Sequence, residues 1–436
     1  MIEPAPDFDE ALLFATTFTQ PQSVKSADLN FDGLPDIAVA GGDPGGIQQG
    51  LSFSGVTVYI NSGTWPSPGF SQVIHLELAQ AGGCQGAGGC LGQELVIANL
   101  DGDVWPDIAV TVKGFNGSHD WLVVFKNLMG LVNPPDPPFQ ATTYALPDVH
   151  RFHGLVAADV NNDGKLDLMA AGANDPSGNP ADAMVLRLDN NGTGGFPSQL
   201  LIPIPGVTGS AWDIVSGDFD GDSDKPDLAT SNLTDDTITV LHRDPTDLGD
   251  GYAIETLTRT VTNPAWQFGA IAAGRLDSDT VRELVCTEQI GNHNHGFNAF
   301  RNVNGSYVHN RPNGNDSGDR YEVVSDGVKT WGLRIGRLNP GSNRDVAYTV
   351  FDATNGAFSS AVHVVVGRGN GRFFRRSNGT AIVYQFAIAP SGGTATAPRD
   401  LQLVDLDDDG LRDIVTANET SNNISVLINM SDRIGS

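Results

Sequence analysis

A short acidic loop near the start of the chain has the chemistry of a cation site. The segment DLNFDGLPD, residues 28–36, carries carboxylate or amide oxygens at its first, third, fifth and ninth positions. Oxygens that converge in so short a turn suit a hard cation of calcium size, which binds oxygen at about 2.3–2.6 Å. An EF-hand would need a glutamate at position twelve and flanking helices, but that position is Val39, in an apolar, β-branched run. We therefore expect a calcium loop that leads into a β-strand.

The loop recurs along the chain. Its first positions are residues 28, 99, 159, 218, 275, 337 and 405, at intervals of 57 to 71 residues. A repeat of this size indicates an array of similar structural units.

The expected ligands are side chains at positions one, three, five and nine, with a main-chain oxygen at position seven. In the fourth unit an extra residue leaves Asp224 and Asp227 to share or exchange the last position. The predicted ligands are Asp28, Asn30, Asp32, Leu34 and Asp36; Asn99, Asp101, Asp103, Trp105 and Asp107; Asp159, Asn161, Asp163, Lys165 and Asp167; Asp218, Asp220, Asp222, Asp224 and Asp227; and Asp405, Asp407, Asp409, Leu411 and Asp413.

Some of the loops depart from the pattern of the first loop. Val104 occupies a position where the first loop has glycine, which strains that turn. The fifth and sixth copies begin with Arg275 and Arg337 but keep Glu283 and Asp345 at position nine. A guanidinium paired with that carboxylate could replace the metal, so we expect about five calcium ions and none in these two units. The alternatives are solvent-exposed arginines and, for all the loops, acidic turns without an ion.

Each unit shows the pattern of four antiparallel strands. Around residue 159, for example, GLVAAD and LDLMAAG flank the loop, and AMVLRLDN, a Gly-rich turn and SQLLIPIPG follow. Four strands in about 60 residues is the size of a propeller blade. We predict an all-β fold, one domain over residues 1–436, with seven four-stranded antiparallel blades. The N-terminal strand, residues 11–19, completes the last blade and closes the ring, which removes the free sheet edges.

The chain resembles the FG-GAP or VCBS repeat family, which includes the seven-bladed propellers of integrin α-subunits. The motif D-x-[DN]-x-D-G-x-x-D is complete at residues 28–36, 159–167 and 405–413, and the Gly-Phe of the family lies at Gly195-Phe196 and in GRFF, residues 371–374. The resemblance implies the propeller fold and calcium. It leaves function open, because such folds serve as adhesion modules, carbohydrate-related enzymes and scaffolds.

Composition narrows the partners. The formal charge of −27 disfavours nucleic acid and anionic membranes. No apolar run approaches a membrane span, and the N-terminus lacks the pattern of a signal peptide.

The three cysteines differ in their surroundings. Cys84 and Cys90 lie in a Gly-rich segment and are expected to form a small disulfide ring, with two free thiols as the alternative. Cys286 is expected to be a buried thiol. We expect a secreted or surface-displayed monomer.

A ligand site is expected on the face opposite the calcium loops. Six residues before each loop start, the chain has Gln22, Gln93, His153, Trp212, Gly269, Trp331 and Arg399, followed in three units by Glu94, Asp213 and Asp400. Tryptophans among polar side chains can stack on sugar rings and bind hydroxyls, although they could instead only pack between blades. The predicted ligand-binding residues are Trp212, Trp331, His153, Arg399, Gln93 and Trp266, with Phe268 close to Trp266.

Three functions fit this sequence. The first is a calcium-stabilised binding or adhesion module for a carbohydrate or a protein. The second is a carbohydrate-active enzyme of the polysaccharide lyase or dehydratase type, with His153 as the base and Arg399 and Asp213 beside it. The third is a scaffold whose partner binds the insertions at residues 41–55 and 79–92. Histidine pairs at His150 with His153 and at His293 with His295 could instead bind zinc, but no third ligand lies close in sequence.

Overall fold

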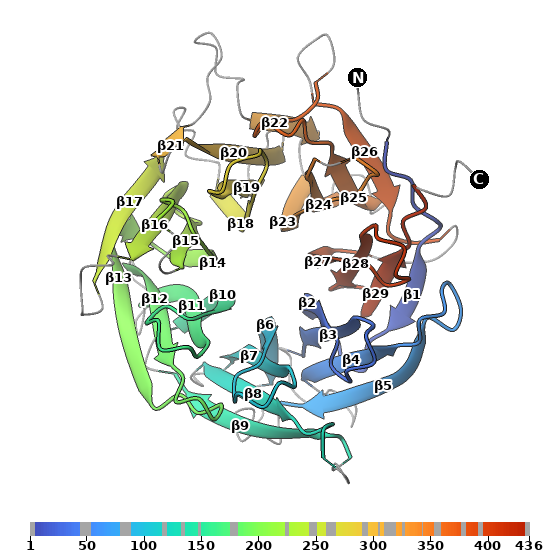
Figure 1. Ribbon diagram of the computed structural model, residues 1–436, viewed down its shortest axis with the longest axis horizontal. Helices are drawn as coiled ribbons and strands as arrows, with labels where there is room; N and C mark the ends of the chain where they lie inside the picture. Colours follow the sequence, from blue (N-terminus) through green and yellow to red (C-terminus); the bar gives the residue numbers. More distant parts are fainter. Residues whose placement is uncertain are drawn as a thin grey trace.

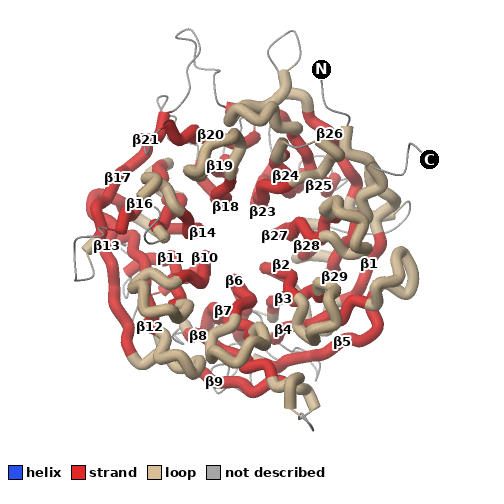
Figure 2. The backbone as a smooth tube through the Cα atoms, in the orientation of Figure 1, coloured by secondary structure: helices blue, strands red, loops and turns tan. Residues whose placement is uncertain are grey.

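The computed structural model is a ring of seven β-sheets around a central opening (Figure 1). It describes residues 5–43, 54–78, 89–115, 120–131, 136–146, 150–174, 182–222, 226–243, 251–258, 267–289, 295–303, 306–308, 320–324, 328–341, 343–352, 359–375, 381–390 and 396–431. Only strands, loops and turns occur among these residues, as Figure 2 shows. The all-β, seven-bladed fold predicted from the sequence is confirmed.

Each blade is an antiparallel sheet whose first strand lines the opening. Blades one to three contain β2 (Pro21–Ala27), β3 (Asp36–Gly41), β4 (Gly55–Asn61) and β5 (Phe70–Glu77); β6 (Cys90–Ala98), β7 (Asp107–Gly114), β8 (Trp121–Asn127) and β9 (Phe139–Ala145); and β10 (His150–Ala158), β11 (Asp167–Asn174), β12 (Asp182–Asp189) and β13 (Ser198–Thr208).

The remaining blades follow the same order around the ring. Blade four has β14 (Ala211–Gly217), β15 (Asp227–Asn232), β16 (Thr237–Arg243) and β17 (Tyr252–Thr258), and blade six has β23 (Val328–Gly336), β24 (Asp345–Asp352), β25 (Ser359–Val365) and β26 (Val383–Ala387). Blade five departs from four strands, because β20 (His295–Val303) pairs with both β21 (Ser306–Val308) and β22 (Arg320–Val324), after β18 (Gln267–Gly274) and β19 (Glu283–Gln289).

The N-terminal strand closes the ring. β1 (Leu12–Ala15) pairs antiparallel with β29 (Asn423–Leu427), next to β28 (Asp413–Asn418) and β27 (Pro398–Val404). Leu12 lies opposite Val426 and Leu13 opposite Ser425. The predicted closure is confirmed, with a shorter strand than the segment 11–19.

The core is divided among the seven junctions between neighbouring blades. Each junction holds one cluster of buried apolar side chains. Every residue of β3 and β4 is buried, whereas in the outer strand β5 only Ile74 and Leu76 are buried. Inner strands are covered on both faces by adjacent blades, which explains their continuous Val, Ile and Ala runs. The loops between the first and second strands are held on this rigid frame.

Candidate functional site

The metal-type loops of blades one, three and seven share one turn geometry. In blade one, the Asp28 carboxylate accepts hydrogen bonds from the backbone N–H groups of Asp32 at 3.1 Å and Gly33 at 2.9 Å. Positions four and six are left-handed, with φ of 58° at Phe31 and 90° at Gly33. The same bonds join Asp159 to Asp163 and Gly164, and Asp405 to Asp409 and Gly410. The N–H of position seven donates to position five in five loops, at Leu34, Trp105, Lys165, Val281 and Leu411.

The carboxylate at position nine is buried beneath its loop. Asp36 accepts hydrogen bonds from the N–H groups of Leu29 and Asn61 at 2.9 and 2.8 Å. Burial nevertheless raises the pKa of Asp36 to about 6, and that of Asp413 to about 8. One oxygen of Asp167 is buried with no hydrogen-bond partner among the described residues. Buried carboxylates of this kind favour a cation, so the residues fit a hard metal ion.

Among the described residues, groups of three ligand atoms lie within 4.8 Å of one another in three blades. Those of Asp405, Asp407 and Asp413 belong to blade seven, those of Asp218, Asp220 and Asp222 to blade four, and those of Asp277, Asp279 and Glu283 to blade five. The blade-five group was not singled out from the sequence, because Arg275 stands at its first position. Arg275 is exposed, and one oxygen of Glu283 is buried without a hydrogen-bond partner in the described part of the chain. The expected lack of calcium there stays a prediction.

In blades two and six, a positively charged side chain of the protein lies at the loop. The Lys126 ammonium, from β8, forms an ion pair with Asp101. Burial opposes ionisation of Asp101, but Lys126 holds the pKa of that carboxyl below its usual value. In blade six the Arg337 guanidinium donates to the carbonyls of Asn339 and Pro340 at 3.3 and 3.2 Å. Val104, the residue of blade two expected to strain the turn, has φ of 83°.

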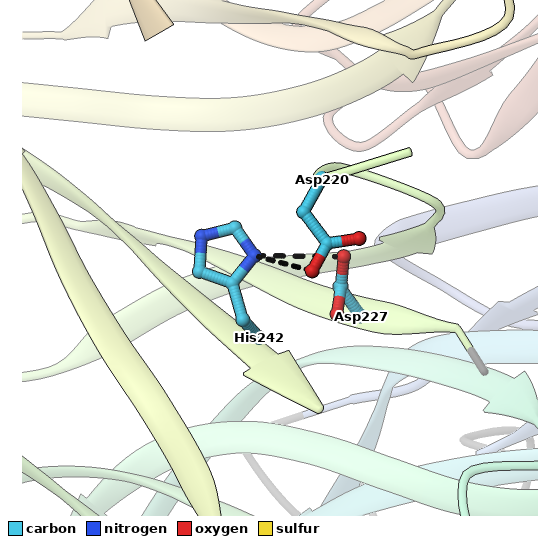
Figure 3. Close-up of side chains that lie close together, drawn as sticks. All are labelled: Asp220, Asp227 and His242. Carbon is cyan, nitrogen blue, oxygen red and sulfur yellow. Dashed lines mark ion pairs between the residues drawn. The ribbon is translucent and has the colours of Figure 1, made fainter. Parts of the chain in front are cut away.

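The fourth loop contains an additional ligand type. His242 of β16 lies beside Asp220 and Asp227, and the three ligand atoms are within 4.8 Å of one another (Figure 3). Sequence reasoning missed this histidine because it follows the loop on another strand. Asp224, one of the two residues expected to compete for the last position, lies outside the described residues.

On the central axis, six of the seven predicted ring residues, all but Gly269, line a cavity of about 380 Å³. Its wall includes Gln22, Lys25, Gln93, Glu94, His153, Trp212, Asp213, Trp331, Arg334, Arg399 and Asp400. The first strand of every blade has a register shift at the predicted ring position, for example between Ala211 and Asp213 and between Pro398 and Asp400. A bulge redirects the side chain of the extra residue. These bulges account for the way Trp212 and Arg399 reach the axis.

The rim of the cavity is aromatic and polar. The rings of His153 and Trp212 stack with centroids 4.0 Å apart. The Arg399 guanidinium carbon lies 3.8 Å from the centroid of Trp331. Arg399 also pairs with Glu419 through bonds of 2.8 and 2.9 Å. The rim is thus built from pairs of side chains that fix one another's orientation.

Below the rim lies a network of charges. Asp400 accepts hydrogen bonds from Lys25 and Arg334, both at 2.9 Å, and Lys25 also pairs with Glu94. Burial raises the pKa of Glu94 to about 7. Burial would also raise the pKa of Asp400, but Arg334 and Lys25 hold it below its usual value. The floor therefore presents both donors and acceptors.

The proposed catalytic residues share this cavity, but each is engaged. His153 lies flat against Trp212, and Arg399 is held by Trp331 and Glu419. The Asp213 oxygens accept hydrogen bonds from the N–H groups of Ile214 and Ile271 at 2.8 and 3.0 Å. Such contacts suit a preformed binding surface better than a mobile general base.

The remaining positions singled out from the sequence are an aromatic residue, the cysteines and several residues outside the described part of the chain. Phe268 is buried against Phe300 in the core rather than at the mouth, because the bulge after it changes the phase of β18. Cys286 is a buried free thiol, and Cys90 is disulfide-bonded. Cys84, Trp266 and His293 lie outside the described residues, as do residues 44–53 and 79–88 of the two insertions.

The comparison with protein families agrees with this architecture. The FG-GAP-like repeat model matches residues 99–170 and 159–230. No curated protein matches the chain. One similar solved structure is titled "Crystal structure of BBS1N in complex with ARL6DN, soaked with mercury"; it is 10% identical over 97% of this chain and 96% of that chain, with a TM-score of 0.49.

The chain is therefore a seven-bladed propeller built with FG-GAP-like repeats. This class of fold is suited to binding and adhesion, because it presents rigidly held loops on two faces. Within the described part of the chain, no helix has the length and apolar character needed to cross a membrane.

Proposed function

We propose that this protein is an extracellular, calcium-stabilised binding module that holds a carbohydrate at the mouth of its central cavity. The cavity of about 380 Å³, walled by residues from the bulged first strands, carries the proposal. This volume lies within the usual range of small-ligand sites, about 300–1,000 Å³.

The chemistry of the wall favours a sugar over an apolar ligand. Trp212 and Trp331 offer aromatic surface, while Gln22, Gln93 and Glu94 offer hydrogen-bonding groups. Sugar rings combine apolar C–H faces with hydroxyls that donate and accept. Because the rim side chains are already paired with neighbours, little conformational entropy is lost on binding.

Two observations support the extracellular and calcium parts of the proposal. The disulfide at Cys90 is typical of oxidising compartments. The loops of blades one, three and seven offer only oxygen ligands above a buried carboxylate, which is the preference of calcium. Calcium bound there would fix the turns and stabilise the folded state by mass action.

The test is a glycan-array screen of the purified protein with calcium, run beside a degradation assay on the same polysaccharides. We expect binding without turnover, and its loss in Trp212→Ala. Trp105→Ala keeps the main-chain carbonyl of the second metal loop and removes an indole that does not line the cavity, so it is the matched control and should bind normally. Chain cleavage that is lost in His153→Ala would instead support an enzyme, and no glycan binding at all would contradict the carbohydrate.

A further inference from the structure

The blades differ at one third-strand position that lies beside the metal loop. In six blades the backbone N–H at the end of the third strand donates to the position-nine carboxylate, which defines an equivalent register: Asn61, Asn127, Asn190, Arg243, Gly367 and Asn429. The residue just before each of these is Ile60, Lys126, Asp189, His242, Val366 and Ile428. Blade four alone among these six places an imidazole there.

The imidazole of His242 faces two carboxylates at distances close to those between two ligands of one metal ion. His242 Nδ1 lies 3.6 Å from Asp227 Oδ2 and 3.8 Å from Asp220 Oδ2 (Figure 3). These distances exceed hydrogen-bond length. They are close to the roughly 3.4 Å that separates two ligands on one tetrahedral zinc ion with bonds of about 2.0–2.1 Å. Nδ1 is buried and has no hydrogen-bond partner among the described residues.

The other ring nitrogen has the partner that a metal-bound histidine needs. Nε2 of His242 lies 3.2 Å from Glu255 Oε2, on the neighbouring strand β17. If Nε2–H donates to Glu255, the unprotonated Nδ1 directs its lone pair toward Asp220 and Asp227. This carboxylate–histidine–metal arrangement fixes the tautomer and orients the ligand.

We propose that blade four binds a transition metal of the zinc class through His242 Nδ1, Asp220 and Asp227. Imidazole nitrogen suits zinc, cobalt and nickel, whereas calcium prefers oxygen alone. Asp220 also belongs to a second group of ligand atoms, with Asp218 and Asp222. The propeller would then hold two kinds of metal, calcium in the all-oxygen loops and a softer ion in blade four.

The competing arrangement is a histidine cation that neutralises the loop by itself. Blade two illustrates it, because Lys126 occupies the same register and pairs with Asp101. Without a metal, Asp227 and then Glu255 raise the pKa of His242 to about 9, against the effect of burial. An imidazolium cannot ligate a metal, so the two arrangements predict different metal binding.

The experiment uses the full chain, stripped of metal and then saturated with calcium, and titrates Co²⁺ and Zn²⁺. We expect one Co²⁺ per chain with visible d–d absorption, and displacement of cobalt by Zn²⁺. His242→Ile supplies the residue of blades one and seven and should weaken binding more than about 100-fold, while Glu255→Gln weakens it by about 10–100-fold. Ile60→Val, in an all-oxygen blade, is the control that leaves the titration unchanged.

X-ray absorption at the zinc edge gives a second readout. Scattering from one imidazole in the wild type, absent in His242→Ile, would support the site even if that variant lost some stability. Equal Zn²⁺ affinity in the wild type and His242→Ile, or a zinc shell of oxygen alone, would overturn the proposal. Because Asp220, Asp227 and His242 are not among the residues that line the axial cavity, glycan binding by His242→Ile remains a separate test of the proposed function.

Discussion

The side-chain amide of Asn127, in blade two, donates a 2.8 Å hydrogen bond to the carbonyl of Leu29, inside the metal loop of blade one. Its second N–H reaches Pro106 in its own loop at 3.1 Å. Equivalent bonds to the preceding blade join Asn61 to Leu406, Asn190 to Leu100, Asn302 to Phe219 and Asn429 to Leu338. Like Asn127, the side chains of Asn61, Asn190 and Asn429 also donate to a carbonyl of their own blade's loop. Each of these four asparagines therefore connects two successive loops around the ring.

Replacing Asn127 by alanine should destabilise the propeller. The change leaves the buried carbonyl of Leu29 and the partly buried carbonyl of Pro106 without these donors. A buried unsatisfied group costs about 1–3 kcal/mol. We expect a loss of about 2–4 kcal/mol in chemical denaturation. Asn127→Asp, which keeps the shape but removes the donors, should behave similarly, and Thr142→Ala on the exposed edge should not. Wild-type stability in both Asn127 variants would show that these bonds contribute little.

The acidic loops and the ring of residues at the axis could be predicted because each depends on residues that are close together in sequence. Nine residues define each acidic turn, and a constant offset from it located Trp212 and Arg399 at the axis. The residues that modify the loops could not be found in this way. Lys126 and His242 follow their loops by about twenty residues, and only the register of the third strand brings them back to the carboxylates. The asparagine contacts were missed for the same reason, since each partner belongs to another blade.

Removing the lysine from blade two should strengthen calcium binding there. In Lys126→Ile, which copies Ile60 and Ile428, the ammonium no longer competes for Asp101, so we expect an affinity increase of about tenfold or more, equivalent to at least ~1.4 kcal/mol. Calcium bound per chain, measured by equilibrium dialysis near half-saturation, should rise. Lys113→Ile removes the same charge outside the loop and serves as the control. An unchanged isotherm would mean that Lys126 does not oppose the ion.

The ring closure depends on a four-residue strand. Leu13 of β1 packs against the cluster between blades six and seven, while Leu12 and Phe14 face the cluster between blades seven and one. Leu13→Ala should cost about 1–2 kcal/mol, less than a fully buried leucine because the site is half-buried. Hydrogen exchange should also accelerate in β29, its pairing partner. Ala15→Ser, at an exposed position of the same strand, is the control, and unaltered exchange in β29 would contradict a closing role.

Acid should destabilise the protein partly through His363. Burial lowers the pKa of this histidine to about 4, and its ring lies 3.4 Å from the Tyr348 hydroxyl. The unfolded chain binds a proton near pH 6.5, whereas the folded chain does so only near pH 4. The neutral ring therefore causes no pH-dependent change in the free energy of unfolding above about pH 6.5. As the pH falls from there to about 4, the free energy of unfolding decreases by about 3 kcal/mol. Urea denaturation between pH 7 and 4.5, with saturating calcium, measures this slope. His363→Phe should flatten it whatever the variant's stability at pH 7, and parallel curves for the two proteins would assign the acid sensitivity to other groups.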